Sequence, residues 1–311
     1  MAVACVLSGC AAEPVPPANP SAAATRTPAA ASAEQPVRKA GTVEGTLRSG
    51  GTRRSYLLHR PEATSARLPL LICLHGRGGN AADMPAVTRF DREAAGMLVV
   101  YPQGLDRQWD DGAGLDRDVR FLRELIGHLA ATEGADAERV YITGFSNGAG
   151  MALRFAAEQP GLVKGVGAVA GQLPPKIEPR GAVPLLLIHG DRDPVRPFAG
   201  LPESSITGTG ADRPTAGIGA EPTAEIFARA ADAGDERRQD VPDKVPDDGT
   251  SLRRLTWSGG TAPVELIIIR GGGHRWPGRP GVPRLNENGV VSEEIDVSRT
   301  IVDFFAGRNR P

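Results

Sequence analysis

The chain has 311 residues, of which 36 are Lys or Arg and 37 are Asp or Glu, so its formal net charge is −1. This balance argues against a nucleic-acid-binding protein with a basic surface and against a polyanionic protein. Hydrophobic residues make up 40% and charged residues 23%, which suits a globular core, and no apolar stretch approaches the roughly 20 residues of a membrane-spanning helix.

The first ten residues end in Leu7-Ser8-Gly9-Cys10. This ending resembles the lipobox of bacterial lipoproteins, in which the cysteine thiol is lipidated. More than one acyl chain on Cys10 would hold the protein stably at a membrane surface. The first basic residue is Arg26, so we expect the basic start of the signal segment to lie upstream of this sequence. The alternative is an alanine-rich end without a targeting function.

The next segment is rich in alanine and proline, with eleven alanines and six prolines in residues 11–40. It cannot bury enough apolar surface to offset the entropy of ordering its backbone, about 1–2 kcal/mol per residue. We therefore expect a disordered tether over residues 11–44 and a single folded domain over residues 45–308.

Three cysteines occur in the chain, Cys5, Cys10 and Cys73. The first two lie near the amino terminus, so the expected domain holds only Cys73 and cannot form an internal disulfide. Cys73 lies in the apolar run Leu70–Leu74, where a small side chain suits a buried strand. A nucleophilic cysteine would need a lowered pKa, and we expect a structural role instead.

Short apolar runs alternate with segments of helical spacing through the rest of the chain. Continuous apolar runs are typical of strands that are buried on both faces, as in a parallel sheet. The alternation predicts a doubly wound, mostly parallel α/β fold. In chain order we expect strands at Ser55–His59, Leu68–His75 and Met97–Tyr101, a helix over Phe121–Leu129, a strand at Val140–Thr143, a helix over Met151–Ala156, strands at Val163–Val169 and Val183–His189, a helix at Thr223–Ala233, strands at Leu252–Trp257 and Val264–Ile269, and a helix at Val297–Phe305.

Two segments lack this pattern. Phe198–Pro222 is dominated by small residues and proline, and Asp235–Thr250 is charged and contains two prolines. Both are expected to be surface loops, and long loops of an α/β enzyme often face the substrate.

Ser146 lies in the pentapeptide Gly144-Phe145-Ser146-Asn147-Gly148, between a predicted strand and a predicted helix. This is the context of a nucleophile elbow, a sharp turn that exposes the serine and leaves no room for side chains two residues away. A chain of this composition contains about 0.2 such pentapeptides by chance, so the flanking elements and the partner residues support the assignment. We predict that Ser146 is a catalytic nucleophile.

The acid and then the histidine follow the serine in the order Ser…Asp/Glu…His. Of the five histidines, only His189 and His274 lie after Ser146, and only His274 also follows the aspartates of His189-Gly-Asp-Arg-Asp193. His274 stands on a glycine-rich loop that can bring its imidazole close to the serine. We predict Asp193 as the acid, since a tight turn follows it, with Asp191 as the alternative; either could instead be a turn residue or a helix cap.

Backbone N–H groups must also stabilise the oxyanion of an acyl-transfer reaction. One donor is expected from Asn147, the residue after the serine. The second is expected from Arg77, in the glycine-rich segment Leu74–Asn80 that follows an apolar strand. A phosphate-binding loop is the alternative for this segment, but it lacks the Lys-Ser/Thr pair of a P-loop.

Together these segments resemble the α/β-hydrolase superfamily, and within it the secreted esterase and polyhydroxybutyrate depolymerase family that includes feruloyl and acetylxylan esterases. The resemblance covers residues 45–307. Its most specific motif is the one around His274, because Gly-x-Ser-x-Gly is shared across the superfamily. The motifs that carry it are Leu74-His-Gly-Arg-Gly-Gly-Asn80, Tyr101-Pro-Gln-Gly104, Trp109-Asp-Asp111, Gly144-Phe-Ser-Asn-Gly148, His189-Gly-Asp-Arg-Asp193 and Gly271-Gly-Gly-His-Arg-Trp-Pro-Gly278.

The resemblance implies a triad of Ser146, Asp193 and His274 that works without a metal ion or another cofactor. It also places Trp109 and Trp276 at the substrate pocket, although large aromatic residues near loops can equally serve in packing.

Two features depart from the family pattern. The neighbourhoods in which relatives often form a disulfide, Ala231–Gly234 and Trp257–Gly260, hold no cysteine. After the acid, this chain has Val195-Arg196-Pro197-Phe198 where relatives have a Val-Pro-Tyr-like sequence, so Arg196 is expected to alter the mouth of the substrate site.

The sequence therefore predicts an extracellular or cell-surface serine carboxylesterase. Its substrates would be polyhydroxybutyrate-type oligomers or related short-chain esters, with no nucleic acid as partner and membrane contact only through a lipidated Cys10. The alternatives are a feruloyl- or acetylxylan-type esterase and an acyltransferase with the same triad. A ligand-binding lipoprotein without catalytic activity is disfavoured by the intact triad order.

Overall fold

The computed structural model describes residues 1–2, 39–62, 66–112, 115–206, 215–278 and 285–308. The expected lipidation site Cys10 and the expected tether up to residue 38 lie outside the described residues. The chain divides into a unit of residues 1–34 and a unit of residues 35–311, and every helix and strand described below belongs to the second. The first strand begins at Gly41, four residues before the expected start of the domain.

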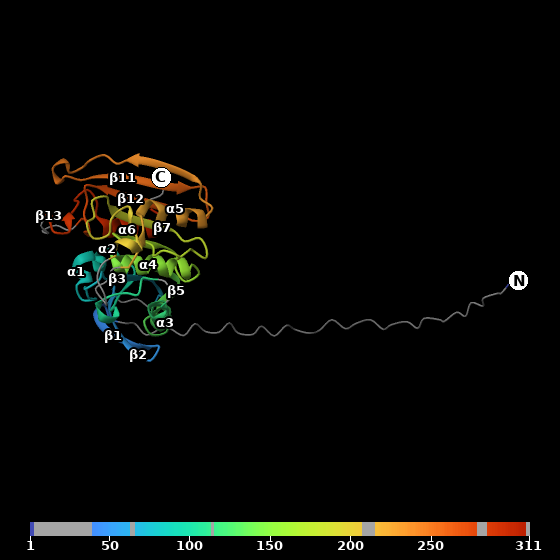
Figure 1. Cartoon of the computed structure of the whole chain (residues 1–311). Coiled ribbons are helices and arrows are strands. Elements are labelled where there is room, and N and C mark those ends of the chain that lie inside the picture. Colours follow the sequence, from blue (N-terminus) through green and yellow to red (C-terminus); the bar gives the residue numbers. More distant parts are fainter. Residues whose placement is uncertain (3–38, 63–65, 113–114, 207–214, 279–284, 309–311) are drawn as a thin grey trace. The chain divides into compact units, whose positions relative to one another are not determined.

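Ten strands form one sheet in the order β1-β2-β4-β3-β5-β6-β7-β12-β11-β10. In Figure 1, β1 and β2 lie at one end of the sheet, and β11 and β12 lie toward the other. The six strands from β4 to β12 in this order run parallel, and the two at each edge are added antiparallel. This arrangement confirms the predicted doubly wound, mostly parallel α/β fold. The strands are β1 (Gly41–Ser49), β2 (Thr52–Arg60), β3 (Leu68–Leu74), β4 (Leu98–Pro102), β5 (Ala135–Phe145), β6 (Val166–Val169), β7 (Leu185–Gly190), β10 (Asp235–Asp240), β11 (Ser251–Ser258) and β12 (Val264–Arg270).

Helices cover both faces of the sheet, which explains why the central strands are continuously apolar. Along β3, Leu70, Ile72 and Leu74 pack into the core cluster that includes α3, α4 and α5, whereas Leu71 and Cys73 pack into the cluster that includes α1, α2 and α6. Cys73 is fully buried, as expected for a structural cysteine. The helices are α1 (Met84–Thr88), α2 (Phe90–Glu93), α3 (Arg117–Thr132), α4 (Asn147–Glu158), α5 (Ala220–Ala230) and α6 (Val297–Phe305).

The expectation of a loop over Asp235–Thr250 is wrong for its first part. Residues Asp235–Asp240 form the edge strand β10, which pairs antiparallel with β11 from Asp235 opposite Ser258 to Asp240 opposite Arg253. All six side chains of β10 are exposed, so the strand has no apolar alternation by which the sequence could predict it. Its charged side chains suit an edge that must not pair with another chain.

The other expected loop, Phe198–Pro222, holds short elements in its described part. β8 (Gly200–Leu201) pairs antiparallel with β9 (Gly217–Ile218), and α5 begins at Ala220, three residues earlier than predicted. The remaining short elements that the structure describes are three 3-10 helices and two strands. They are η1 (Leu105–Arg107), η2 (Glu203–Ser205), η4 (Pro246–Asp248), β13 (Leu285–Asn286) and β14 (Gly289–Val290). None of the helices in the described residues is long and apolar enough to cross a lipid bilayer.

Candidate active site

The candidate site lies at the carboxyl ends of the parallel strands. In chain order β4 is added on one side of β3 and β5 on the other, so the sheet has its topological switch point between β3 and β5. Ligands of open α/β sheets bind in the crevice at such a point. The loops after β3 and β5 carry His75 and Ser146, and the loops after β7 and β12 carry Asp193 and His274.

Ser146 occupies the sharp turn between β5 and α4. Its φ of 56° and ψ of −120° are strained for a residue with a side chain. The turn is held by hydrogen bonds from the Ser146 N–H to the Val169 carbonyl (2.9 Å) and from the Gly150 N–H to the Ser146 carbonyl (3.0 Å). A Cβ atom on Gly148 would lie 2.4 Å from the His75 carbonyl oxygen, so only glycine lets α4 pass this close to β3. The local geometry is that of a nucleophile elbow.

Ser146, His274 and Asp193 form a continuous chain of hydrogen bonds. The Ser146 Oγ lies 2.8 Å from His274 Nε2, and His274 Nδ1 lies 2.7 Å from Asp193 Oδ2. All three side chains are buried. A carboxylate only accepts hydrogen bonds, so it places the imidazole proton on Nδ1 and leaves Nε2 free to accept the serine proton.

The second oxygen of the Asp193 carboxylate is held by backbone groups. Its Oδ1 accepts hydrogen bonds from the N–H groups of Val195 (2.8 Å) and Arg196 (2.7 Å). Asp191, the alternative acid, instead accepts a hydrogen bond from the Gly271 N–H at 2.7 Å. The structure therefore brings Asp193, and not Asp191, into contact with His274.

The glycine-rich segment after β3 lies beside the serine. A Cβ atom on Gly76 would be 3.4 Å from Ser146 Cβ, which brings the Gly76–Arg77 backbone next to the reacting centre. The other expected oxyanion donor, the Asn147 N–H, belongs to the first residue of α4. N–H groups in the first turn of a helix have no partner within the helix and lie at the positive end of its dipole.

His75 fixes the shape of this segment. Its Nε2 accepts a hydrogen bond from the Gly104 N–H (3.0 Å), so the proton lies on Nδ1, which donates to the Gly76 carbonyl (2.8 Å). Burial lowers the pKa of His75, which favours this neutral form. His75 thus shapes the turn, the role that its place at a strand end suggests.

The placement of Trp109 corrects the expectation that it lines the substrate pocket. Its side chain is 2% exposed, stacks on Phe121, and donates a hydrogen bond from Nε1 to the His75 carbonyl at 2.9 Å. Its backbone is bound at both ends by the Asn147 side chain, with distances of 2.7 and 3.0 Å. Trp109 therefore supports the site from behind, and its aromatic type alone did not separate packing from substrate contact.

A cavity of about 350 Å³ is lined by His274 and by Phe145, the residue before Ser146. Trp276 lines it, and its indole is fixed by a hydrogen bond to the Ser298 hydroxyl (3.1 Å) and by edge contacts with Phe90 and Phe145. Both apolar and polar residues line the cavity. The apolar lining consists of Met84, Val87, Phe145 and Trp276, and the polar side chains are those of His75, Arg77, Asn80, Asp83, His274, Arg275, Asn286 and Asn288.

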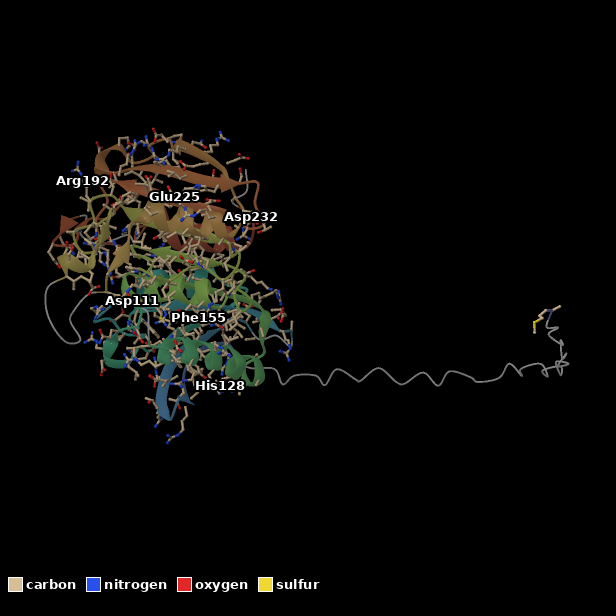
Figure 2. The ribbon with its side chains drawn as sticks, turned by 45° about the vertical axis from the view of Figure 1, so that its right-hand side comes forward. Asp111, His128, Phe155, Arg192, Glu225 and Asp232 are labelled. Carbon is tan, nitrogen blue, oxygen red and sulfur yellow. The ribbon has the colours of Figure 1, made fainter. Side chains whose placement is uncertain are left out.

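Arg196 does not lie at the mouth of the site, contrary to expectation. It is 4% exposed, and its guanidinium forms an ion pair with Asp111 at 3.3 Å. Figure 2 labels Asp111, and it also shows Arg192 reaching the surface one residue before the buried Asp193. Sequence reasoning did not find the pairing of Arg196 with Asp111, because 85 residues separate the two.

His189, at the end of β7, is buried and stacks on Phe198 with the ring centres 5.9 Å apart. Neither of its ring nitrogens has a hydrogen-bond partner among the described residues. Burial lowers its pKa to about 4, with opposing contributions from the nearby Asp193 and His274. The ring is therefore neutral at neutral pH and takes no part in the chain of hydrogen bonds.

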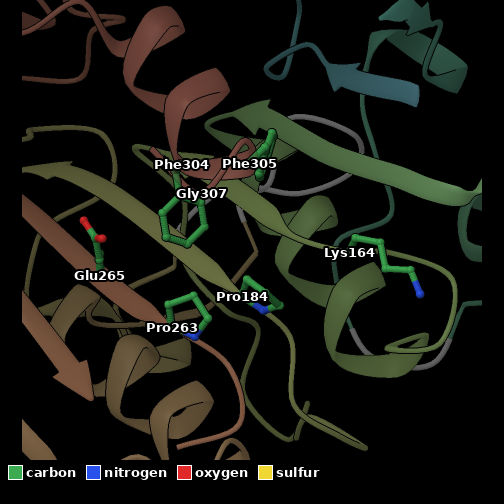
Figure 3. Close-up of a pocket in the computed structure, with 7 residues that line it drawn as sticks. All are labelled: Lys164, Pro184, Pro263, Glu265, Phe304, Phe305 and Gly307. Carbon is green, nitrogen blue, oxygen red and sulfur yellow. The ribbon is translucent and has the colours of Figure 1, made fainter. Parts of the chain in front are cut away.

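A separate pocket of about 100 Å³ lies at the opposite end of the sheet (Figure 3). Lys164, Pro184 and Pro263, which line it, precede β6, β7 and β12, so the pocket is remote from the carboxyl ends of these strands. In the part of the chain that the structure describes, no three His, Cys, Asp or Glu side chains cluster so that they could hold a metal ion.

Comparison with known proteins places the chain among esterases. Residues 102–204, which include Ser146 and Asp193, match the Phospholipase/Carboxylesterase family. NocK of Nocardia uniformis subsp. tsuyamanensis, whose name describes it as an esterase, is 34% identical over 322 residues, which cover 95% of this chain and 93% of the relative.

More distant relatives share parts of the chain. Feruloyl esterase C of Emericella nidulans is 28% identical over 157 residues, covering 47% of this chain and 57% of the relative. Poly(3-hydroxyalkanoate) depolymerase C of Paucimonas lemoignei is 27% identical over 282 residues, covering 80% of this chain and 65% of the relative. The solved structure of the acetyl xylan esterase of Aspergillus awamori has a similar fold, with a TM-score of 0.56 at 13% identity over 75% of this chain and 94% of that one.

Proposed function

Since the chain belongs to the α/β-hydrolase family of esterases, we propose that it is a serine carboxylesterase with Ser146, Asp193 and His274 as its catalytic triad. The observation that supports this proposal best is the unbroken chain of hydrogen bonds from Ser146 Oγ through the imidazole to Asp193, at 2.8 and 2.7 Å. A serine in a strained turn without a base beside it would have no means of losing its proton.

In the proposed reaction, Ser146 Oγ attacks the carbonyl carbon of the ester while His274 Nε2 takes the hydroxyl proton of the serine. Asp193 holds the imidazole in the required tautomer and stabilises the imidazolium that forms. His274 then gives the proton to the oxygen of the leaving alcohol. The alcohol departs, and the acyl group remains bound to Ser146 as an acyl-enzyme. A water molecule then attacks the acyl carbon while His274 Nε2 takes its proton; the bond from the acyl carbon to Ser146 Oγ breaks, His274 returns the proton to Oγ, and the carboxylic acid leaves.

The tetrahedral intermediates carry a negative charge on the former carbonyl oxygen. The Asn147 N–H at the start of α4 and the Arg77 N–H are proposed to bind this oxygen. Loss of one such donor typically costs about 3–4 kcal/mol of transition-state stabilisation. His75 and Trp109 support the donors from behind through their hydrogen bonds to Gly76 and Asn147.

The proposed substrates are oligomers of the polyhydroxybutyrate type or related short-chain esters. The depolymerase and feruloyl esterase relatives support esters of hydroxy acids and of aromatic acids respectively. The cavity of about 350 Å³, lined by apolar residues such as Phe145 and Trp276 and by polar side chains, has room for a short acyl group.

The test is a series of p-nitrophenyl esters of increasing acyl length, with 3-hydroxybutyrate oligomers and methyl ferulate alongside. Replacement of Ser146 by alanine is expected to lower kcat at least about 10⁴-fold, because no other group can form the acyl-enzyme. Ser258→Ala, which changes an exposed serine on β11, serves as the matched control and keeps full activity. An active Ser146→Ala protein would refute the mechanism.

We also propose that the protein works outside the cytoplasm, held at the cell surface by a lipidated Cys10. The support is the sequence Leu7-Ser8-Gly9-Cys10, followed by a segment rich in alanine and proline that separates it from the domain.

A further inference from the structure

Three buried side chains and one half-buried side chain form a polar cluster next to the loop that carries the proposed acid. We call Asp111, Gln172, Arg196 and Thr215 the Arg196 cluster. The Arg196 guanidinium donates hydrogen bonds to the Thr215 carbonyl (2.6 Å), to Asp111 Oδ2 (3.3 Å) and, more weakly, to Gln172 Oε1 (3.5 Å). The side chains of Arg196 and Asp111 are only 5% and 4% exposed.

The Arg196 cluster is fixed to the helix that begins at the serine. A Cβ atom on Gly150 of α4 would lie 2.9 Å from Asp111 Oδ2, so the Asp111 carboxylate rests directly on this helix. Asp111 Oδ1 accepts a second hydrogen bond from the Thr215 hydroxyl at 2.6 Å. Arg196 is therefore bound to a carboxylate whose place is set by the same helix that presents Ser146.

The loop that carries Asp193 is also fixed on its other side. The Gly271 N–H donates to Asp191 at 2.7 Å, and the Arg192 N–H donates to the Gly272 carbonyl at 3.0 Å. These two bonds join the beginning of the loop to the segment that carries His274. The end of the loop is held by the side chain of Arg196 and by Gln172, whose Nε2 donates a hydrogen bond to the Pro197 carbonyl at 2.7 Å.

The position of the Arg196 backbone also sets the rotation of the Asp193 carboxylate. The N–H groups of Val195 and Arg196 bind Oδ1, so Oδ2 is the oxygen that meets His274. If the end of the loop shifts, Oδ1 loses its two donors and the carboxylate is free to rotate away from the imidazole.

We propose that Arg196 is a positioning residue, which through its ion pair with Asp111 holds Asp193 in the orientation that His274 requires. This inference rests on the proposed function, since it assigns a role within the triad. No member of the Arg196 cluster lines the cavity of about 350 Å³. Its loss should therefore lower kcat and leave KM nearly unchanged.

The test is a double-mutant cycle between Arg196→Met and Asp193→Asn in the full chain. Alone, Arg196→Met is expected to lower kcat about 10- to 100-fold, the range that a small misplacement of a catalytic group can cause. In the Asp193→Asn protein, the same change should lower kcat less than about 2-fold, because residues that act through one another are not additive. An additive effect would overturn the positioning role.

A second pair of variants guards against misfolding. Arg196→Met leaves the buried Asp111 charge without its partner, whereas Arg196→Met combined with Asp111→Asn leaves no net charge in the cluster. Arg196→Lys keeps the positive charge but lacks the second nitrogen of the guanidinium, so it cannot bind the Thr215 carbonyl and Asp111 in the same way. Its kcat should therefore lie between those of the wild type and Arg196→Met. A lysine variant with the kcat of Arg196→Met, or a neutral double variant with the kcat of the wild type, would contradict the proposal.

Arg60→Met is the matched control, since Arg60 pairs with Glu133 at 2.7 Å with side chains 18% and 15% exposed and has no contact with the acid loop. Proton NMR gives a readout other than activity. The low-field signal of the His274 Nδ1–H should weaken or move upfield in Arg196→Met and persist in Arg60→Met. An unchanged signal in Arg196→Met would overturn the proposal.

The outcomes separate this proposal from the proposed function. An Asp193→Asn protein with full activity would refute the triad itself. A nearly inactive Asp193→Asn protein, combined with an additive effect of Arg196→Met, would leave the esterase mechanism standing and remove only the role of Arg196.

Discussion

Asp191 and Asp193 are two positions apart, yet their carboxylates lie in different surroundings. Asp193 is buried and accepts three hydrogen bonds, one of them from His274, while Asp191 is exposed and binds the backbone of Gly271. The bond from Asp193 to His274 and the bond from Asp191 to Gly271 both reach the loop that carries the histidine. One aspartate therefore ties down the backbone of that loop, and the other meets its side chain.

The sequence favoured Asp193 over Asp191 from the turn that follows it, and the structure places Asp193 against His274. It could not predict the surroundings of Trp109 or Arg196. A large aromatic residue or an arginine near a loop has the same local sequence pattern in a substrate pocket as in the interior. The difference depends on partners such as Asp111, 85 positions from Arg196 along the chain.

At the residue scale, His189 should make the stability of the protein depend on pH. Burial lowers its pKa to about 4, so the unfolded chain takes up a proton below about 6.5 while the folded chain does not. The contribution is complete above pH 6.5 and is lost as the pH falls toward 4, by up to about 3 kcal/mol. His189→Phe should remove this dependence without loss of stability at pH 7, since neither ring nitrogen has a partner among the described residues.

Urea unfolding of the wild type and of His189→Phe between pH 4 and pH 7 measures this difference. Other groups titrate in both proteins, such as Asp110, whose pKa burial raises to about 6, so the comparison isolates His189. Equal slopes of unfolding free energy against pH in the two proteins would contradict this prediction, because they would show that folding does not lower the pKa of His189.

At the scale of elements, the turn from β5 to α4 determines where the serine stands. The turn is possible because the chain has glycine on both sides of it, at Gly144 and Gly148. A Cβ atom on Gly148 would meet the carbonyl oxygens of Leu74 and His75 at 2.6 and 2.4 Å, so these contacts involve backbone that cannot move aside. The start of α4 is thus wedged against the end of β3.

Gly148→Ala should therefore push α4 away from β3, with a cost of about 1–3 kcal/mol in unfolding free energy and a large loss of kcat. Gly127→Ala is the matched control, because Gly127 lies within α3 and a Cβ atom there meets nothing within 4 Å. That variant should be more stable by about 0.5–1 kcal/mol and fully active. Thermal unfolding together with the ester assay checks both, and a fully active Gly148→Ala protein would contradict the wedge.

The elements that the sequence predicted best are those in which the pattern of apolar side chains follows the burial of the element. The central strands were found because both faces are covered and they consist mainly of apolar residues, as in β4 and β7, where every residue is buried. β10 was missed because no part of it is buried. β1 was missed because its partly buried positions are held by small or isolated apolar residues, such as Gly41 and Val43, within the segment assigned to the tether.

At the scale of the whole molecule, every residue of the proposed reaction lies between His75 and Trp276, so the chemistry should not depend on the proposed lipid anchor. Cys10→Ser is expected to move the protein from the membrane fraction to the soluble fraction of cells and to leave kcat/KM unchanged. Mass spectrometry of the amino terminus should find lipid on Cys10. An unmodified amino terminus upstream of Cys10 in the mature protein would refute the anchor.

The serine and the histidine of the proposed site are 128 positions apart, and the histidine and its acid are 81 apart. None of these contacts can form within a local hairpin or helix, and long-range contacts of this kind form slowly because large loops must close first. A chain still emerging from synthesis, or one that has collapsed without completing the order β5-β6-β7-β12, therefore has no working nucleophile. The rate at which ester hydrolysis recovers after dilution from denaturant would therefore measure the last stage of folding.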